Sequence, residues 1–559
     1  MKTKPFEEII KRTFPGILSA WTIGFLILLY APLEQYVTNI DGFTYDFYDL
    51  IRVMLPLFLI YAAVSAGIMF LSEKLFPKTA GWFSAVCIAV FAALYIQGTF
   101  FSGNLPPLDG SVVDWTQYDN QRICSVLIWI LAAAGAFAAG KFISRDRLLR
   151  GTRILSVLIL ITLFLSAVLL TVTGEGFRDK HDLLVTDDKM LEMSDSEDNL
   201  VILVLDCIGG NDFYEITENN PEYAGQLKDF TFFRNTVGAY PFTQYSVPYI
   251  LSGEWYENGE SFYSYKERVY CEAPLLTELR NRKYNIGLYE QDLPTSEKAV
   301  GYAENAAVSD AKHFNNIKGF ITTQLKLSGL KYFPYDLKRF CIVAPDFLYA
   351  NSLKKYDVEN TFDWSNMAFY QTVKNGEITP SDEKCFRFIH ISGAHDPFLY
   401  DKNMNITEDA GYVSCIEGSI KCVSEYLDLL KASGCYENTA IIVMADHGYF
   451  EDTRQNPLLL IKGIGESHPY RISEAPISYE DLQQAYVRLM DGEKSENLFD
   501  WREGDARERR YLEYIFYSED HMKEYLQRGY ATDPETFQPT GNEYIREGTY
   551  ITSHSFFDW

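Results

Sequence analysis

Hydrophobic residues are distributed unevenly along the chain. Up to about residue 172 they form long continuous runs, whereas the rest of the chain is polar, aromatic and acidic with shorter apolar runs. A helix of about 20 apolar residues is long enough to cross the hydrocarbon core of a bilayer. Five runs approach that length, and they predict membrane-spanning helices at 14–32, 51–72, 81–98, 124–141 and 154–172.

The basic residues that flank these runs predict the topology of the chain in the membrane. They precede the first run, lie between the second and third runs, and crowd the connection between the fourth and fifth, which contains Lys141, Arg145, Arg147, Arg150 and Arg153. The alternate connections carry aspartates instead. Because loops rich in lysine and arginine stay on the cytoplasmic side, we expect a multi-pass protein of the cell membrane. Its N-terminus would be cytoplasmic and its C-terminal part extracytoplasmic.

The polar part of the chain contains short strands that alternate with helices. Its first residues, 173–198, are charged and poor in aromatic residues, which is typical of a linker. Beyond them, the apolar runs predict strands at 199–206, 284–289, 386–392, 439–445 and 458–462, and helices at 274–282 and 417–431. Such alternation predicts a largely parallel sheet with crossover helices. The ligands of such sheets bind beyond the carboxyl ends of the strands.

The last part of the chain has a different pattern. From Arg509 on, tyrosine and phenylalanine alternate with polar residues, which predicts a small antiparallel sheet. Together the patterns predict a protein of the α/β class in four parts. These are a transmembrane domain of five helices at 1–172, a juxtamembrane linker at 173–198, an α/β domain with a largely parallel sheet at 199–508, and a β-rich C-terminal subdomain at 509–559.

The acidic residues exclude one class of partner. The chain carries 76 aspartates and glutamates against 50 lysines and arginines, and the acidic excess lies beyond residue 172. A surface of this charge repels nucleic acid at long range, so we expect no nucleic-acid partner. An anionic lipid headgroup could still bind where a metal ion or local basic residues offset the negative field.

Residues with metal-binding side chains follow two of the predicted strands. Asp206 ends the strand at 199–206, and Asp446 and His447 come directly after the strand at 439–445. A strand often ends in aspartate because the turn requires it, but an Asp-His-Gly sequence after one buried strand and an aspartate after another is a stronger signal. Two carboxylates and an imidazole suit a divalent cation such as Zn²⁺ or Mn²⁺.

Candidate nucleophiles lie in the segment Tyr-Pro-Phe-Thr-Gln-Tyr-Ser-Val-Pro at 240–248. A hydroxyl group at the start of a helix feels the helix's positive end, and coordination to a cation would lower its pKa. Both effects favour an alkoxide that can attack phosphorus. Thr243 and Ser246 are the candidates, and each is also a common helix-capping residue.

A third element is the sequence His-Ile-Ser-Gly-Ala-His-Asp-Pro at 390–397, where another apolar strand ends. Small residues precede His395, which favours close approach to a ligand. Its imidazole could bind a substrate phosphate or protonate a leaving group. A single histidine after a strand can also be purely structural.

These elements occur in an order that resembles the alkaline phosphatase/sulfatase superfamily. The motifs are Leu-Val-Leu-Asp at 203–206, Thr-Gln-Tyr-Ser-Val-Pro at 243–248, Gly-Ala-His-Asp-Pro at 393–397 and Val-Met-Ala-Asp-His-Gly at 443–448. Four motifs in order are more specific than any one alone. Over about residues 199–490 the chain is most similar to the superfamily's membrane branch, which contains lipoteichoic acid synthases, phosphoethanolamine transferases and sulfatase-like proteins associated with cell-envelope polysaccharides.

The resemblance implies a fold and a site. It implies an alkaline phosphatase/sulfatase-like α/β catalytic domain after the five helices. Asp206 matches the first acidic metal ligand of the family, and Asp446 and His447 match the pair that completes the metal site. Thr243 matches the threonine that binds metal and becomes covalently phosphorylated, and His395 matches a histidine that contacts substrate.

Departures from the family pattern narrow the expected chemistry. The segment 243–248 lacks the Cys/Ser-x-Pro-x-Arg context of formylglycine-dependent sulfatases, so we do not expect hydrolysis of sulfate esters. Ile391 stands where two-metal phosphatases place an aspartate, four residues before the equivalent of His395, so we expect one divalent ion, Zn²⁺ or Mn²⁺. For the second substrate-side histidine of the phosphoethanolamine transferases, His468 is only a weak candidate.

The resemblance also implies an activity. It is the metal-dependent transfer of a phosphorylated headgroup, of the phosphoglycerol or phosphoethanolamine type, from a membrane phospholipid to an extracytoplasmic cell-envelope glycan or polymer, with Thr243 as the covalent carrier. Two alternatives stay open. One is a phosphodiesterase or phosphatase that uses the same site with water as acceptor, and the other is a non-catalytic lipid-sensing membrane protein.

Overall fold

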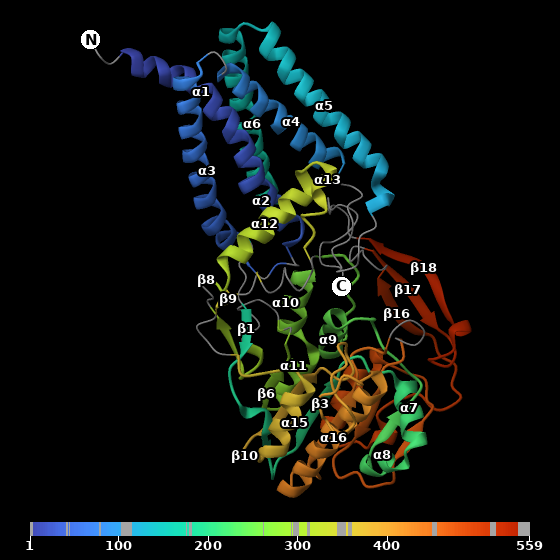
Figure 1. Cartoon of the computed structure of the whole chain (residues 1–559). Helices are drawn as coiled ribbons and strands as arrows, with labels where there is room; N and C mark the ends of the chain where they lie inside the picture. The colour runs from blue at the N-terminus through green and yellow to red at the C-terminus, as the bar shows by residue number, and fades with distance from the viewer. Residues whose placement is uncertain are drawn as a thin grey trace.

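The computed structural model contains a bundle of long helices and an α/β domain, joined near the middle of the molecule (Figure 1). One hydrophobic core surrounds the central sheet and a second lies among the long helices. The end of the predicted C-terminal subdomain, 546–559, and part of the predicted linker lie outside the described residues. The structure describes residues 4–40, 43, 45–77, 80–101, 115–174, 176–177, 182–260, 262–291, 293, 301–309, 313–343, 351, 354–355, 360–449, 455–514 and 521–545.

Five helices are long and apolar enough to cross a membrane, as the apolar runs predict. They span Ile9–Thr38, Phe47–Leu75, Gly81–Phe100, Trp115–Phe142 and Arg145–Thr173. Figure 1 labels them α1 (Lys4–Phe25) with α2 (Ala31–Thr38), α3 (Phe47–Leu75), α4 (Ala80–Phe100), α5 (Asp119–Phe142) and α6 (Arg145–Thr173). The helix α1 packs against α3, α4 and α6, so the first span forms the centre of the bundle.

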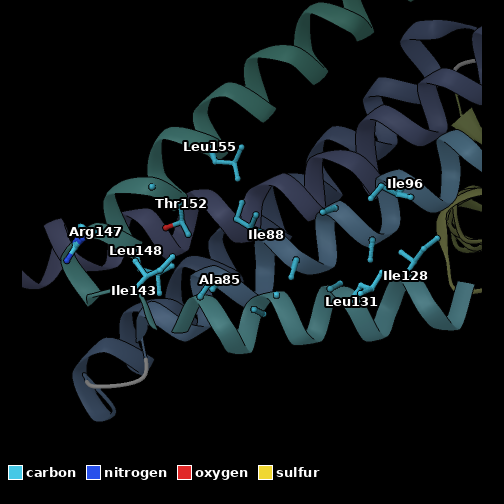
Figure 2. A pocket seen from close by; sticks show the side chains of 18 residues that line it. Ala85, Ile88, Ile96, Ile128, Leu131, Ile143, Arg147, Leu148, Thr152 and Leu155 are labelled. Carbon is cyan, nitrogen blue, oxygen red and sulfur yellow. The ribbon is translucent and has the colours of Figure 1, made fainter. Parts of the chain in front are cut away.

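The helix α5 is the least buried of the five, because only 11% of its most apolar stretch is covered by the rest of the protein. A groove of about 640 Å³ lies between α4, α5 and α6 (Figure 2). Small and aliphatic side chains such as Ala92, Gly135 and Leu155 line it, and Arg147 lies at one end. This side of the bundle is therefore loosely packed and presents a hydrocarbon surface.

The centre of the α/β domain is a seven-stranded sheet with the order β14-β4-β13-β12-β3-β11-β6. The central strand β3 is buried along its whole length and runs parallel to both β11 and β12. The strand β13 is antiparallel to its two neighbours. The largely parallel sheet is thus confirmed. Its strands are β3 (Asn199–Leu205), β4 (Thr231–Phe233), β6 (Tyr284–Tyr289), β11 (Lys384–Ile391), β12 (Thr439–Met444), β13 (Leu459–Lys462) and β14 (Arg471–Ser473).

Helices in two packed groups complete the core around this sheet. One group contains α7 (Gly210–Asn219), α15 (Asn366–Asn375) and α16 (Tyr412–Ser433). The other contains α9 (Thr243–Ser252), α10 (Phe262–Glu272), α11 (Pro274–Asn281) and α17 (Leu482–Met490). Both predicted helices exist, as α11 and α16. The shorter elements are β1 (Asp182–Val185), β2 (Glu192–Ser194), α8 (Pro221–Gln226), β5 (Thr236–Val237), β7 (Ala306–Ser309), β8 (His313–Phe314), β9 (Lys354–Lys355), β10 (Thr379–Ser381) and β15 (Ile477–Ser478).

The predicted C-terminal antiparallel sheet is also present. It contains β16 (Arg509–Tyr514), β17 (His521–Gln527) and β18 (Phe537–Ile545), which pair in that order. Arg509 is fully buried and donates hydrogen bonds to the backbone and side-chain oxygens of Asn235 at 2.6 and 3.0 Å. These bonds tie the small sheet to the main domain.

One segment of the α/β domain packs against the membrane helices, which the sequence patterns did not predict. The helices α12 (Ile317–Tyr332) and α13 (Tyr335–Lys338) lie across the ends of the bundle, between it and the rest of the α/β domain (Figure 1). Phe320, Leu327 and Leu330 of α12 belong to the hydrophobic core of the bundle. Polar contacts add to this interface: Tyr332 donates a hydrogen bond to Glu34 at 2.5 Å, Gln324 donates to Tyr45 at 2.8 Å, and Lys331 pairs with Glu34 at 3.1 Å.

The close approach of α12 to α4 allows a test of this interface. A Cβ atom added at Gly98 would lie 2.3 Å from the ring of Tyr332, so we expect Gly98→Ala to push α12 away and to cost about 1–3 kcal/mol of stability. The matched control is Gly135→Ala on α5, where an added Cβ would meet open space among the described atoms. Thermal unfolding and limited proteolysis in detergent measure the difference. Equal stability of the two variants would contradict the interface.

Candidate metal and catalytic site

The predicted metal-binding side chains meet at one edge of the central sheet. Asp206 directly follows β3, and Asp446 and His447 follow β12. Because β3 and β12 are adjacent parallel strands, their carboxyl ends lie side by side. Thr243 is the first residue of α9 and approaches the same point. The topology therefore brings together four residues that are widely separated in sequence.

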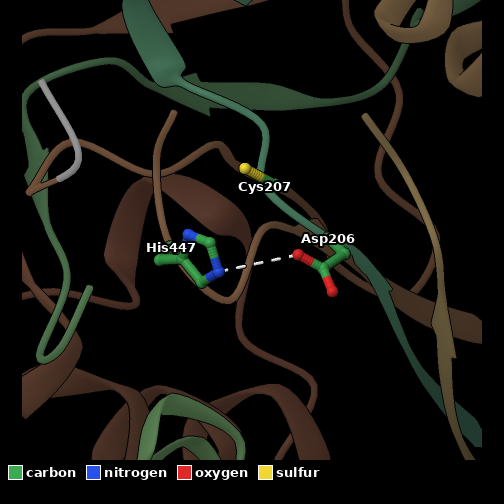
Figure 3. A group of neighbouring side chains, drawn as sticks. All are labelled: Asp206, Cys207 and His447. Carbon is green, nitrogen blue, oxygen red and sulfur yellow. Dashed lines mark ion pairs between the residues drawn. The ribbon is translucent and has the colours of Figure 1, made fainter. Parts of the chain in front are cut away.

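The atoms of these four residues converge. The Thr243 Oγ1 atom lies 3.3 Å from Asp206 Oδ2 and 3.5 Å from His447 Nε2. The His447 Nε2 atom lies 3.6 Å from Asp206 Oδ1, the contact that Figure 3 marks, and 3.5 Å from Asp446 Oδ2. The side chains of Asp206, Asp446 and His447 are all buried. A hydroxyl, two carboxylates and an imidazole thus face one small volume.

Hydrogen bonds outside this volume fix the orientation of the donors. Asp446 Oδ1 accepts hydrogen bonds from the backbone N–H groups of Cys207 at 3.1 Å and His447 at 2.9 Å, which leaves Oδ2 facing the site. The Nδ1 atom of His447 lies 2.9 Å from the carbonyl oxygen of Gly448. An N–H on Nδ1 leaves the lone pair of Nε2 directed at the site, as a metal ligand requires.

The arrangement fits a divalent cation. Among the residues that the structure describes, Asp206 Oδ1 and Asp446 Oδ2 are buried atoms with no hydrogen-bond partner. Buried polar atoms normally have partners, so these call for a ligand. The separations of 3.3–3.6 Å exceed ordinary hydrogen bonds. Two ligands each about 2.0–2.1 Å from a tetrahedral ion lie about 3.3 Å apart.

The charges of the site shift the pKa values of Asp446 and Cys207. Burial opposes ionisation of Asp446, but His447 and His390 hold its pKa below the usual value of an aspartate. Burial, reinforced by the carboxylates of Asp206 and Asp446, raises the pKa of Cys207 well above its usual value. The Cys207 side chain lies close by, and its Sγ atom is within 4.8 Å of a donor atom each of Asp206 and His447 (Figure 3).

The two candidate nucleophiles are distinguished by where their side chains point. Thr243 reaches the donor cluster, whereas Ser246 is fully buried and donates a hydrogen bond to the carbonyl oxygen of Tyr240 at 3.1 Å. The residue at the N-cap of α9 is Phe242, and no side chain caps this helix. Neither hydroxyl therefore serves as the N-cap, and of the two it is the hydroxyl of Thr243 that lies beside the donor cluster.

The structure places His395 beside the donor cluster rather than in it. Its side chain is exposed, and its Nδ1 atom contacts the carbonyl oxygen of Asp396. The ring of Trp364 packs against both His395 and His390, with centroid distances of 5.8 and 6.4 Å. Within the described part of the chain, His395 makes no hydrogen bond to the metal-binding side chains. An exposed position next to the cluster suits contact with a substrate.

Two residues near the site were not among the predicted ones. His390 lies on β11 with its Nε2 atom 3.5 Å from Asp206 Oδ2, and its Nδ1 atom lies 2.7 Å from Glu290 Oε2. Burial acts to lower the pKa of His390, but Glu290 and Asp206 raise it well above the usual value. Sequence signals exist for both residues: a histidine among the apolar residues that end β11, and a glutamate directly after β6.

His468, the weak candidate for a second substrate-side histidine, is bound elsewhere. Its Nε2 atom lies 2.8 Å from Glu466 Oε1, and its backbone N–H donates to Asp229. The side chain is buried, and the groups of potential metal ligands found among the described residues do not include it. It therefore has a structural role in the loop after β13.

Comparison with known proteins assigns the chain to a family. No curated protein matches it in sequence. Among solved structures, the lipoteichoic acid synthase LtaP from Listeria monocytogenes is 12% identical with a TM-score of 0.35, over 64% of this chain and 88% of that chain. A phosphonate monoester hydrolase from Silicibacter pomeroyi is 14% identical with a TM-score of 0.35, over 61% of this chain and 88% of that chain.

A protein of the alkaline phosphatase superfamily from Vibrio parahaemolyticus is 12% identical with a TM-score of 0.34, over 65% of this chain and 85% of that chain. The family model described as Sulfatase matches residues 198–485, just over half of the chain. This range contains all four motifs and every candidate site residue. The chain belongs to the sulfatase family.

Proposed function

We propose that the protein transfers a phosphorylated headgroup from a membrane phospholipid to an extracytoplasmic cell-envelope glycan or polymer through a phospho-threonine intermediate. The headgroup would be of the phosphoglycerol or phosphoethanolamine type. The observation that carries the proposal is the position of the Thr243 hydroxyl, 3.3 Å from Asp206 and 3.5 Å from His447 at the start of α9.

The residues of the site divide into a binding set and a reacting set. Asp206, Asp446 and His447 would hold one divalent cation, Zn²⁺ or Mn²⁺, together with Thr243. When bound, that cation would supply positive charge to the nucleophile and to the phosphoryl oxygens. The start of α9 adds partial positive charge at Thr243, because the first N–H groups of a helix have no partners within it.

The first half-reaction forms the covalent intermediate. Thr243 Oγ1 attacks the phosphorus of the lipid phosphodiester, a bond between Thr243 and phosphorus forms, and the bond from phosphorus to the diacylglycerol oxygen breaks. The hydroxyl of Thr243 releases its proton to water, and the diacylglycerol oxygen gains a proton. We assign delivery of that proton to His395, whose exposed ring adjoins the site.

The second half-reaction releases the headgroup. A hydroxyl of the acceptor attacks phosphorus, the bond from phosphorus to Thr243 breaks, and the Thr243 oxygen takes up a proton from water. The acceptor loses its proton to His395, which reverses the role of that residue in the first step. With water in place of the acceptor, the same steps describe a phosphodiesterase.

Two features support a lipid donor and a phosphoryl rather than a sulfuryl group. Five candidate membrane spans and the packing of α12 on them keep the site attached to the membrane domain. The nucleophile segment carries threonine where formylglycine-dependent sulfatases need cysteine or serine.

The buried donor cluster argues against a non-catalytic lipid sensor, because unsatisfied buried carboxylates are costly unless a ligand uses them.

Peptide mass spectrometry tests the proposal. The protein is purified from its own membranes with divalent metal present, and the peptide that contains residues 243–248 is analysed. We expect phosphoglycerol or phosphoethanolamine on Thr243, and Ser246 in the same peptide serves as the unmodified internal control. Absence of any adduct after rapid quenching with donor lipid would contradict the covalent route. Product analysis with and without an acceptor separates transfer from hydrolysis.

A further inference from the structure

The buried pair of His390 and Glu290 has no role in the steps described so far. His390 is 2% exposed on β11, and Glu290 is 4% exposed just after β6. Their side chains meet at 2.7 Å, between Nδ1 of His390 and Oε2 of Glu290. On the other side of the ring, Nε2 of His390 lies 3.5 Å from Asp206 Oδ2.

We propose that His390 is a further ligand of the divalent cation through Nε2, and that Glu290 is a positioning residue that sets the orientation and tautomer of the His390 ring. The proposal rests on the metal site of the proposed function and extends it to two residues that the family motifs do not name.

The first argument is the position of the donor atom. One donor atom each from Asp206, His390 and Asp446 lies within 4.8 Å of the other two, which is close enough for a common ion. His390 Nε2 is buried and, among the described atoms, has no hydrogen-bond partner. Its 3.5 Å separation from Asp206 Oδ2 falls within the 3.3–3.6 Å that separate the other donor atoms of the site.

The second argument is the orientation of the ring. Glu290 Oε2 lies 2.7 Å from Nδ1 of His390, so the carboxylate holds the ring with Nε2 facing Asp206. A cation bound at Nε2 would take the place of a proton on that nitrogen. A carboxylate behind a histidine ligand is a common device in metal sites, because it fixes the ring and raises the basicity of the ligand.

The third argument is the rigidity of the elements that carry the pair. His390 lies near the carboxyl end of β11, where it pairs with Val204 of β3, and β11 pairs with β6 on its other side up to Ile389. Asp206 and Glu290 come directly after those two neighbouring strands. Three adjacent parallel strands therefore fix the positions of Glu290, His390 and Asp206 relative to one another, and no loop needs to move to bring them together.

Metal binding by the full-length protein in detergent tests the proposal without any assay of activity. The protein is stripped with a chelator, and the affinity for Zn²⁺ is measured by competition with a chromophoric chelator. Absorption of the Co²⁺-loaded protein reports the ligand set. We expect His390→Ala and Glu290→Gln to weaken Zn²⁺ binding about 10- to 100-fold, and His390→Ala also to change the Co²⁺ spectrum.

The matched control is the other buried histidine–glutamate pair, His468 with Glu466, whose side chains meet at 2.8 Å. His468→Ala should leave Zn²⁺ affinity and the Co²⁺ spectrum unchanged. Wild-type affinity and an unchanged spectrum in His390→Ala would overturn the proposal and leave the pair a purely structural one.

If His390→Ala does not fold, His390→Gln replaces it and is judged on the same two readouts. The same measurements separate this proposal from the proposed function. A wild-type protein that binds no divalent cation would contradict both. Binding by the wild type that does not change in the His390 variants would contradict only the role of His390 as a ligand.

Discussion

Replacement of Thr243 by alanine is expected to reduce turnover by about 10⁴-fold or more, because removal of a nucleophile eliminates the covalent route. The fold should survive, since Thr243 is the first residue of α9 and does not cap that helix. Assays of headgroup release from a labelled phospholipid, with the variant and the wild type at equal metal loading, measure the loss.

Two variants sharpen this test. Thr243→Ser keeps a hydroxyl group and should restore part of the activity. Ser246→Ala removes a hydroxyl only three residues away, whose hydrogen bond to Tyr240 lies outside the donor cluster, so we expect a cost of about 1 kcal/mol in stability and little change in turnover. Substantial headgroup release by Thr243→Ala would show that another group attacks phosphorus.

Replacement of Asp446 by asparagine should abolish metal-dependent stabilisation as well as activity. In the wild type, a cation at 100 times its dissociation constant adds about 2.7 kcal/mol to the free energy of unfolding. The asparagine side chain can still accept the backbone hydrogen bonds of Cys207 and His447, but it removes the negative charge that faces the site. We also expect a loss of turnover of about 10³-fold or more.

Thermal unfolding with and without Zn²⁺ or Mn²⁺ measures this effect. Asp229→Asn is the matched control, because Asp229 is also buried and accepts hydrogen bonds from His468 and Tyr436, and it is not one of the grouped metal-ligating residues. The control should keep the metal-dependent rise in melting temperature. A rise of equal size in Asp446→Asn would mean that the cation binds elsewhere.

Elements that bury a continuous apolar run could be predicted from the sequence. The five spans, the strand β3 and the strand β12 each consist almost entirely of apolar residues, so their local composition is enough to predict them. The direction of β13 was harder to foresee, because an apolar run of four residues gives no information about the strand beside it. Parallel and antiparallel neighbours bury such a run equally well.

Contacts between distant segments could not be predicted in this way. Gln324 and Tyr332 of α12 donate hydrogen bonds to Tyr45 and Glu34, nearly 300 residues away along the chain. The sequence of α12 itself contains no sign of these partners. The pairing of His390 with Glu290 spans 100 residues and depends on β11 and β6 being neighbours. Five candidate site residues lie in recognisable sequence motifs, namely Asp206, Thr243, His395, Asp446 and His447, whereas the pairing of His390 with Glu290 depends on strand order.

The packing of α12 and α13 against the bundle fixes the distance between the candidate site and the candidate membrane helices. A domain joined to the membrane by a flexible linker would lie at a range of distances from the bilayer. A domain that packs against its own membrane helices stays at one distance. For the proposed lipid donor, the search for substrate becomes two-dimensional diffusion at that height. Under the proposed function, an acceptor would then be modified only along the part of its length that comes within this fixed distance of the membrane.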